Sequence, residues 1–470
     1  MNRRRRQFLI SVGTIGIAGC AGDSNENLRS DTPRTDDESL TRTSSSTNNP
    51  ETPTVIPRIK LTENPTPQSP NSRTPVVTPP DTAPPEQQAS KIAASDGENG
   101  DEFGASVAIS GDGTTAIIGV PEDEIPHEAP GTAYAVTRSD GSWNKVNKLV
   151  PDGDATLFGE SVAVSYDGET ALIGAANSWG PGGTTGLAYV FERSAESWSQ
   201  QIKLNAADGD AGDYFGESVA VSDDGRTAVV GAIGDQGING ESSGSAYVFD
   251  GSGGFWNQKA KLVPEDGDRD DTFGRAVAVS SDGTTALIGA DGDEDPNGEA
   301  SSYRGSGGSA YVFEESDESW GQMAKLAAGD GDKTDSFGSA VSLSGDGTTA
   351  LVGTNSGNSA YIFDGIDDAW NQTTKIAVDR GNLAGFGVAV ALSNDGKRAL
   401  IGATGTGSVY LFSGSTGSWK DVATLVPNDD SSDNFGSAVA ISSDGATALI
   451  GDSNGGSPNG DSTGAAYIFQ

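Results

Sequence analysis

The sequence predicts an all-β fold: a seven-bladed β-propeller of four-stranded antiparallel blades, closed by an N-terminal strand and preceded by a disordered tether. First, a Phe-Gly pair opens a similar unit seven times, at intervals of 49 to 64 residues. Second, the last unit lacks one strand, which the segment ahead of the first unit can supply. Third, 66 glycines and an apolar fraction of 34% are typical of many tight turns between short strands.

Each repeat unit contains four short segments that are rich in β-branched and small apolar residues. In the third unit these segments are Ser218–Ser222, Thr227–Ala232, Ser245–Phe249 and Trp256–Leu262. An Asp-Gly pair, a strong hairpin signal, lies between the first two. Four antiparallel strands per unit describe a propeller blade. The opening pairs are Phe103-Gly104, Phe158-Gly159, Phe215-Gly216, Phe273-Gly274, Phe337-Gly338, Phe386-Gly387 and Phe435-Gly436.

The two ends of the repeat region complete each other. The seventh unit stops at Ala466–Gln470 without a fourth segment, whereas Lys91-Ile92, ahead of the first Phe-Gly, has the layout of one. We expect the N-terminal segment to complete the last blade, which removes two open sheet edges. An open solenoid or stacked sandwiches would gain nothing from this permutation. The fourth segments of the other units begin with a tryptophan that we expect in the core or between blades, rather than as a sugar-binding platform: Trp143, Trp198, Trp256, Trp320, Trp370 and Trp419.

Residues 1–19 are predicted to be an export signal, because a cluster of arginines precedes an apolar run too short to span a membrane. Arg5 and Arg6 belong to a stretch that resembles a twin-arginine signal, and Ile17–Cys20 resembles a lipoprotein lipobox. The resemblance implies cleavage before Cys20, a lipid on its sulfur, and an extracytoplasmic protein anchored to the outer face of the cell membrane. The alternative is an ordinary leader in which Cys20 is incidental.

Residues 20–88 are predicted to be a stalk that remains disordered. The stretch is rich in Pro, Ser and Thr and has almost no aromatic residues, so it cannot bury enough apolar surface to offset the entropy of ordering. It is either an unmodified linker or an O-glycosylated stalk. Residues 89–470 form the predicted propeller.

The formal net charge of −38 excludes nucleic acids as partners, because such a chain repels phosphate backbones. It also opposes compaction unless salt screens it, so a halophilic source would explain it. The chain has one histidine, His127, which we expect to be an exposed loop residue. With one His and one Cys, the usual catalytic triads and zinc sites cannot be assembled.

The units resemble the FG-GAP repeat of integrin-type propellers, in its shorter prokaryotic form, over residues 89–470. The resemblance implies a seven-bladed propeller used for adhesion and ligand binding. The calcium loop Asp-x-Asp-x-Asp-Gly of integrin-type repeats is replaced by hairpins such as Ser110–Gly113, so the family's calcium sites are not carried over. Besides the Phe-Gly pairs, the matching residues are Gly119-Val120-Pro121, Gly174-Ala175, Gly231-Ala232, Gly289-Ala290, Gly353-Thr354, Gly402-Ala403 and Gly451-Asp452.

Variable and acidic loops are expected on one face of the ring. In an up-and-down blade, the loop after the second strand and the link to the next blade emerge at the same end, and loop function usually gathers there on a rigid scaffold. The acidic links Asp208–Asp213, Asp266–Asp271 and Asp330–Asp335 are interpreted as solvated turns, with calcium binding as the alternative. Because the motif fades at Asp379–Asn382, calcium cannot be required by every blade.

The function we expect is non-enzymatic recognition of an extracellular protein or glycan, with no catalytic residues and no required cofactor. One alternative is a hydrolase or lyase acting on extracellular polysaccharide, for which the insertion Asp291–Gly308, with Tyr303 and Arg304, is the best candidate site. Another alternative is a scaffold for envelope assembly. Asn371 heads an N-glycosylation sequon, Asn371-Gln372-Thr373.

Overall fold

The computed structural model describes residues 60–63, 83–123, 131–153, 155–180, 183–236, 242–293, 307–330, 335–366, 369–377, 385–415, 417–429, 434–455 and 462–470. All of them belong to the compact unit Val55–Gln470. Arg5, Arg6, Cys20, His127, Tyr303 and Arg304 lie outside the described residues. Among the residues described, no helix is long and apolar enough to cross a membrane.

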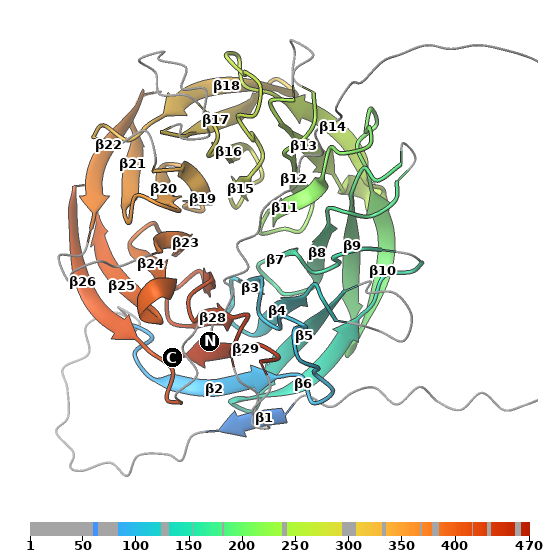
Figure 1. Cartoon of the computed structure of the whole chain (residues 1–470), viewed down its shortest axis with the longest axis vertical. Helices are drawn as coiled ribbons and strands as arrows, with labels where there is room; N and C mark the ends of the chain where they lie inside the picture. Colours follow the sequence, from blue (N-terminus) through green and yellow to red (C-terminus); the bar gives the residue numbers. More distant parts are fainter. Residues whose placement is uncertain are drawn as a thin grey trace, which may run out of the picture. The chain divides into compact units, whose positions relative to one another are not determined.

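Seven antiparallel sheets stand around a central axis, with consecutive sheets side by side (Figure 1). Blade 1 contains β3 (Val107–Ile109), β4 (Thr115–Val120), β5 (Thr132–Ser139) and β6 (Ser142–Leu149). Blade 2 contains β7 (Ser161–Val164), β8 (Thr170–Ala175), β9 (Leu187–Ser194) and β10 (Ser197–Leu204). Blade 3 contains β11 (Phe215–Val221), β12 (Thr227–Ala232), β13 (Ser245–Asp250), the 3₁₀ turn η1 (Ser252–Gly254) and β14 (Asn257–Leu262). Blade 4 contains β15 (Ala276–Val279), β16 (Thr285–Ala290), β17 (Ser309–Ser316) and β18 (Ser319–Leu326).

The remaining three blades repeat this plan. Blade 5 contains β19 (Phe337–Leu343), β20 (Thr349–Thr354), β21 (Ala360–Ile366) and β22 (Ala369–Ile376). Blade 6 contains β23 (Phe386–Leu392), β24 (Arg398–Ala403), the 3₁₀ turn η2 (Thr404–Thr406), β25 (Ser408–Ser415) and β26 (Ser418–Leu425). Blade 7 contains β27 (Ala438–Ile441), β28 (Ala448–Asp452), β29 (Ala465–Phe469) and, from the other end of the chain, β2 (Gln88–Ala93). The predicted all-β, seven-bladed fold is therefore confirmed.

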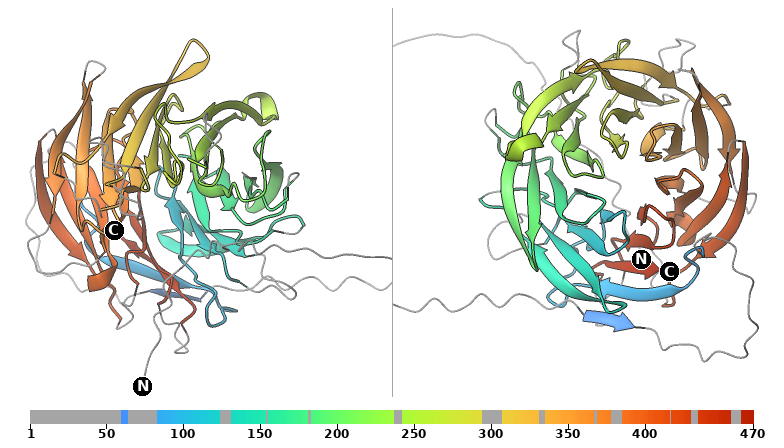
Figure 2. Two further views of the ribbon diagram at one scale, coloured as in Figure 1. Left: turned by 45° about the horizontal axis from the view of Figure 1, so that its top comes forward. Right: turned by 180° about the vertical axis from the view of Figure 1, so that it is seen from behind.

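The ring closes where the sequence predicts. β2 and β29 lie side by side at the closure of the ring (Figure 2). They pair antiparallel, with Lys91 opposite Tyr467 and Ile92 opposite Ala466. The backbone N–H of Gln470 also donates to the carbonyl of Gln87 at 2.9 Å. A further strand, β1 (Lys60–Glu63), pairs with β2 and lies within the stretch that was expected to be an unstructured stalk.

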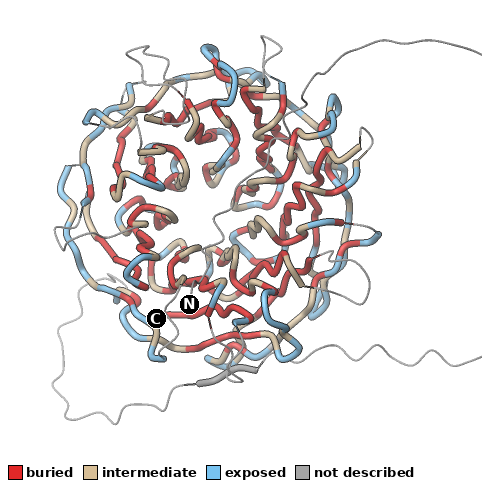
Figure 3. The backbone as a smooth tube through the Cα atoms, viewed as in Figure 1, coloured by how far each residue is buried: buried red, intermediate tan, exposed pale blue. Residues whose placement is uncertain are grey.

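The apolar core lies between neighbouring blades. Seven clusters of buried side chains each combine residues from two adjacent sheets, as where Leu172 and Val190 of blade 2 meet Phe215 and Val230 of blade 3. Because both faces of a blade are covered, its middle strands are buried almost throughout (Figure 3). The cluster at the seam includes Ile92 of β2, which is fully buried against blade 1. The seam therefore has the same kind of apolar interface as the other six junctions.

The fourth-strand tryptophans pack at the edges of these clusters, as predicted. Trp143 is buried within the cluster at the seam. The other five are half-buried and pack against the junction on one side of their blade: Trp198, Trp256, Trp320, Trp370 and Trp419.

Candidate functional site

The Phe-Gly pair has two structural tasks, both of which fix the end of a blade. The Phe215 ring is fully buried and meets the Tyr247 ring edge-on, with centroids 5.6 Å apart. Gly216 has φ +96°, and its carbonyl lies against Gly174 of the preceding blade so closely that a Cβ there would be 2.0 Å away. Phe-Gly and the Gly-Ala ending of the second strand therefore contact each other across each blade junction.

The acidic links are docked onto the blades that follow them. Asp208 accepts hydrogen bonds from Lys261 Nζ at 2.7 Å and from the Tyr247 hydroxyl at 3.0 Å. Asp235, which follows β12, receives the same two donors at 2.8 Å and 2.5 Å. The same arrangement recurs in blade 4 with Asp266, Asp293, Lys325 and Tyr311. We call this group of one lysine, one tyrosine and two aspartates the link latch.

Contacts within the acidic links shift the pKa values of their aspartates. Burial acts to raise the pKa of Asp208, but hydrogen bonds from Lys261 and Tyr247 outweigh it and hold that pKa below its usual range. Further along the same links, burial raises the pKa of Asp213 to about 6 and that of Asp271 to about 7. These two links are therefore anchored by ion pairs and by one buried carboxyl each, while their other aspartates are exposed, as expected for solvated turns.

Blade 6 lacks the lysine of the latch. Its fourth strand carries Thr424 where the other blades have lysine, and the link that leads into it is the one in which the acidic motif fades. In blades 1 and 5 the lysine is paired with an aspartate, Lys148 with Asp123 at 2.7 Å and Lys375 with Asp330 at 2.9 Å. In blade 2, Lys203 instead donates to the Asp152 carbonyl. Within the described ranges, no group of three or more His, Cys, Asp or Glu side chains is arranged to hold a metal ion. Calcium binding at the links, the alternative to solvated turns, is not tested by the structure.

The turn between the first two strands has the same sequence in every blade, Ser-x-Asp-Gly. The serine hydroxyl donates to the aspartate, as from Ser222 to Asp224 at 2.7 Å, and also accepts from the backbone N–H of the first residue of the next strand, as from Thr227 at 3.0 Å. This fixes the turn without a cation. The x residues lie nearest the axis, and we call them the axial ring: Gly111, Tyr166, Asp223, Ser281, Gly345, Asn394 and Ser443.

Backbone hydrogen bonds join the axial ring into a closed circle. The N–H of Asp223 donates to the carbonyl of Ser281 at 3.1 Å, and Ser281 donates in turn to Gly345 at 2.9 Å. The circle continues through Asn394 and Ser443 to Gly111, and Asp112 N–H completes it by donating to the Tyr166 carbonyl at 3.1 Å. All seven blades are therefore connected at the axis by main-chain groups alone.

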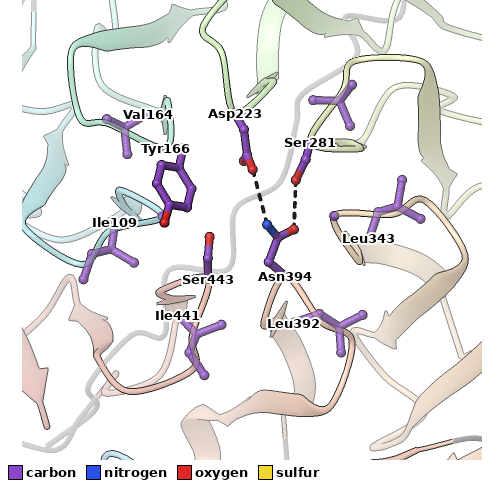
Figure 4. A pocket seen from close by; sticks show the side chains of 13 residues that line it. Ile109, Val164, Tyr166, Asp223, Ser281, Leu343, Leu392, Asn394, Ile441 and Ser443 are labelled. Carbon is purple, nitrogen blue, oxygen red and sulfur yellow. Dashed lines mark hydrogen bonds between the residues drawn. The ribbon is translucent and has the colours of Figure 1, made fainter. Parts of the chain in front are cut away.

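A cavity of about 150 Å³ lies at the axial ring (Figure 4). Asn394 reaches across it, donating from Nδ2 to Asp223 Oδ2 at 3.3 Å and accepting from Ser281 Oγ at 2.9 Å. Gly345 leaves the space for this, because a Cβ there would lie 1.4 Å from Asn394 Oδ1. The remaining wall is apolar and comes from the first strands: Ile109, Val164, Val279, Leu343, Leu392 and Ile441.

Two glutamates and an arginine lie at the other end of the first strands, directly after the Phe-Gly pairs of blades 2 to 4: Glu160, Glu217 and Arg275. Burial, and then repulsion from the Glu217 carboxylate, raise the pKa of Glu160 to about 8. Glu217 forms an ion pair with Arg275. Burial also raises the pKa of Glu217, although the Arg275 guanidinium opposes that rise. Both carboxyl groups are therefore harder to ionise than exposed glutamates.

The comparisons with known proteins agree with this architecture. The FG-GAP repeat matches residues 87–137, 198–249, 256–313, 320–363 and 419–469, which together make up more than half of the chain. The chain belongs to the FG-GAP repeat family. A comparison with curated proteins finds no match.

Solved structures similar to this FG-GAP protein share its fold at low sequence identity. One is hydrazine synthase of Kuenenia stuttgartiensis, with TM-score 0.51, 15% identity, and coverage of 79% of this chain and 96% of that chain. Another is the β-propeller domain of Cps50 (Swd1) from Myceliophteria thermophila, with TM-score 0.53, 12% identity, and coverage of 82% and 100%. At these identities the likeness shows the fold alone.

Other sequence-predicted positions of the FG-GAP ring are placed as follows. Within the insertion of blade 4, Asp291 accepts from the Thr272 hydroxyl at 2.7 Å and Asp293 joins the link latch. Tyr303 and Arg304 of that insertion lie outside the described residues. Asn371 is exposed on β22. The axial ring and the Glu160–Glu217 pair were not predicted, although the sevenfold Ser-x-Asp-Gly pattern is a sequence signal for the ring.

Proposed function

We propose that this FG-GAP propeller is a surface recognition module that binds an extracellular protein or glycan without catalysing a reaction. It would be held off the membrane by residues 20–88 and by a lipid on Cys20, on the outer face of the cell. The binding surface would be the face that carries the loops after the second strands and the inter-blade links, which we call the loop face. We call the opposite face, with the Ser-x-Asp-Gly turns, the turn face.

The observation that carries this proposal is the contrast between the two faces. Loops from second to third strand range from 4 residues in blade 6 to 18 in blade 4. The connections from first to second strand, on the turn face, have five or six residues in every blade. Because the scaffold beneath is closed and fully paired, it tolerates variation on the loop face at little cost, which is how binding loops are usually arranged.

An exposed aromatic residue on the loop face supports the same proposal. Trp179, in the loop between β8 and β9, is 72% exposed. The next residue, Gly180, is fixed by a hydrogen bond from its N–H to the Gly183 carbonyl at 2.7 Å. A large aromatic surface presented beside a rigid turn can bind a partner at a small entropic cost.

The test is binding of the full chain, at high salt, to intact cells and to an array of envelope-type glycans. Trp179→Ala should weaken binding by at least tenfold. Phe255→Ala is the matched control, since Phe255 is 75% exposed in the hairpin between β13 and β14 on the turn face. Equal losses in the two variants, or no binding to any cell or glycan, would contradict the proposal.

One observation favours the enzymatic alternative. Burial raises the pKa of both Glu160 and Glu217, the two carboxyl groups repel each other, and glycoside hydrolysis uses a pair of carboxyl groups whose acid member has a raised pKa. An assay for reducing ends released from labelled polysaccharides decides between the two functions. Turnover that disappears in Glu160→Gln would replace the recognition proposal by a hydrolase.

A further inference from the structure

We propose that the cavity at the axial ring is a second binding site, on the turn face, which takes a small neutral hydroxyl-rich compound such as one sugar unit. This goes beyond recognition through the loop face, because it uses different residues at the opposite end of the ring. The structural facts that support it are the freedom of the ring side chains, the size of the cavity, and the hydrogen-bonding groups that line it.

The fold does not fix the side chains of the axial ring. Ser, Asp and Gly are identical in all seven turns, whereas the ring position itself varies. Gly111 and Gly345 show that the ring position needs no side chain, because the circle of hydrogen bonds is made by backbone groups. Tyr166, Asp223 and Asn394 are therefore not required for closure of the ring.

The size of the cavity suits one small ring-shaped molecule. A cavity of about 150 Å³ accommodates benzene in a known engineered case, and corresponds to about five water molecules. Gly111 contributes to this space, since a Cβ there would lie 2.2 Å from Tyr166 Cδ2 and 2.6 Å from Ser443 Oγ. Replacing a glycine of the ring would therefore push Tyr166 and Ser443 away from their present positions.

The polar groups at the cavity combine donors and acceptors. Asp223 accepts only, whereas the hydroxyls of Tyr166 and Ser443 do both, and across the described part of the chain neither hydroxyl has a hydrogen-bond partner. Sugar hydroxyls also donate and accept, so they match this set. The Tyr166 side chain is 44% exposed and offers an aromatic face to the C–H edges of a sugar ring.

Other ligand classes fit the cavity poorly. No lysine or arginine is among its lining residues, so the charged group that a phosphate or carboxylate would meet is the like-charged Asp223. Calcium needs six to eight oxygen ligands, but the ring carbonyls already accept hydrogen bonds and Asp223 supplies the one carboxylate of the lining. A purely apolar ligand would cover the hydroxyls of Tyr166 and Ser443 without giving either of them a hydrogen-bond partner. A neutral polyhydroxy compound is what remains.

The test is saturation-transfer NMR on the full chain with methyl α-D-glucopyranoside, methyl α-D-mannopyranoside, methyl α-D-galactopyranoside and myo-inositol. We expect transfer from at least one probe at millimolar concentration, with affinity lowered at least tenfold in Asp223→Gly and in Tyr166→Gly. Both substitutions install the residue that blades 1 and 5 already have in the ring, so the fold should survive. Unfolding midpoints equal to that of the parent chain verify this.

The control separates this site from the loop face. Trp179→Ala should leave transfer to the sugar probes unchanged while it weakens recognition of cells or glycans at least tenfold. Absence of transfer from every probe at tens of millimolar would overturn the inference, and so would transfer that persists unchanged in Asp223→Gly and Tyr166→Gly. Neither result would affect the proposal for the loop face.

Discussion

The carbonyl oxygen of Gly104 lies against Gly451 at the seam of the ring, 2.1 Å from the position that a Cβ on Gly451 would take. Gly104 opens the first blade and Gly451 ends the second strand of the last one, so the contact joins opposite ends of the folded chain. At an internal junction, Gly231 would place a Cβ 2.0 Å from the Gly274 carbonyl. The seam is therefore packed as closely as a junction within the chain, and it can be tested in the same way.

Gly451→Ala should destabilise the propeller by about 1–3 kcal/mol, because a methyl group at this point forces two backbones apart. The measurement is the urea unfolding midpoint at constant high salt. Gly321→Ala on β18 is the matched control, since a Cβ there meets nothing within 4 Å. If both variants unfold at the same urea concentration, the close contact between blades at Gly451 does not contribute to stability.

Ile92→Ala should weaken the attachment of β2 to blade 7 more than a substitution at an exposed position does. Ile92 is fully buried in the cluster between blades 7 and 1, so the truncation should cost about 2–5 kcal/mol. Hydrogen exchange should increase first in β29, which has β2 as its outer neighbour, and then in β28, which pairs with β29. Val422→Ala, at a 39% exposed position, serves as control. Uniform exchange in all seven blades would argue against a seam that opens first.

Asp208 and Lys261 should be energetically coupled, but weakly. The Asp208 side chain is 51% exposed, so a double-mutant cycle with Asp208→Asn and Lys261→Met should give about 0.5–1 kcal/mol. The pKa of Asp208 is lowered in the folded state, so this contribution is present above the ordinary carboxyl pKa and is lost as the pH falls through the lowered value. The cycle is measured at pH 7 and repeated in strong acid. A coupling that is unchanged in acid would rule out the ion pair as its source.

The sequence was sufficient for the ring topology because each repeat signal has a direct steric meaning. Phe215 fills the apolar junction between blades 2 and 3, and Gly216 permits the close approach of two backbones there. Lys91-Ile92 supplies the fourth strand that the last repeat unit, ending after Ala466, lacks. These are local requirements repeated seven times, and repetition separates them from chance.

The sites were harder to predict because they depend on which residues meet around the axis. Tyr166 and Asn394 are 228 positions apart in the numbering, and nothing in their local sequence shows that both line one cavity. Likewise, Lys261 and Asp208 belong to different repeat units, so the acidic links were interpreted as solvated turns. The paired change at blade 6, where Thr424 follows a faded acidic link, was a sequence signal of the latch.

Stability should decrease as the pH rises from about 5 to about 8, and Glu160 should account for part of that decrease. Burial and the nearby Glu217 carboxylate raise the pKa of Glu160 from 4.5 to about 8, so the folded chain keeps a proton that the unfolded chain releases over this range. The stability that protonated Glu160 contributes is fully present below the unfolded pKa of 4.5. It decreases as the pH rises toward the folded pKa of about 8, and it does not change above that value. Asp271, with a pKa raised to about 7, acts in the same direction.

Glu160→Gln should therefore flatten, without abolishing, the dependence of unfolding free energy on pH between those limits. Urea unfolding at pH 5 and at pH 8.5, in constant high salt, measures the difference for each variant. Glu169→Gln, at an exposed position in the turn between β7 and β8, should retain the parent slope. A Glu160→Gln chain that keeps the full parent slope would contradict the buried, protonated state of Glu160, because a carboxyl group with a raised folded pKa lowers stability as the pH increases and its removal must reduce that slope.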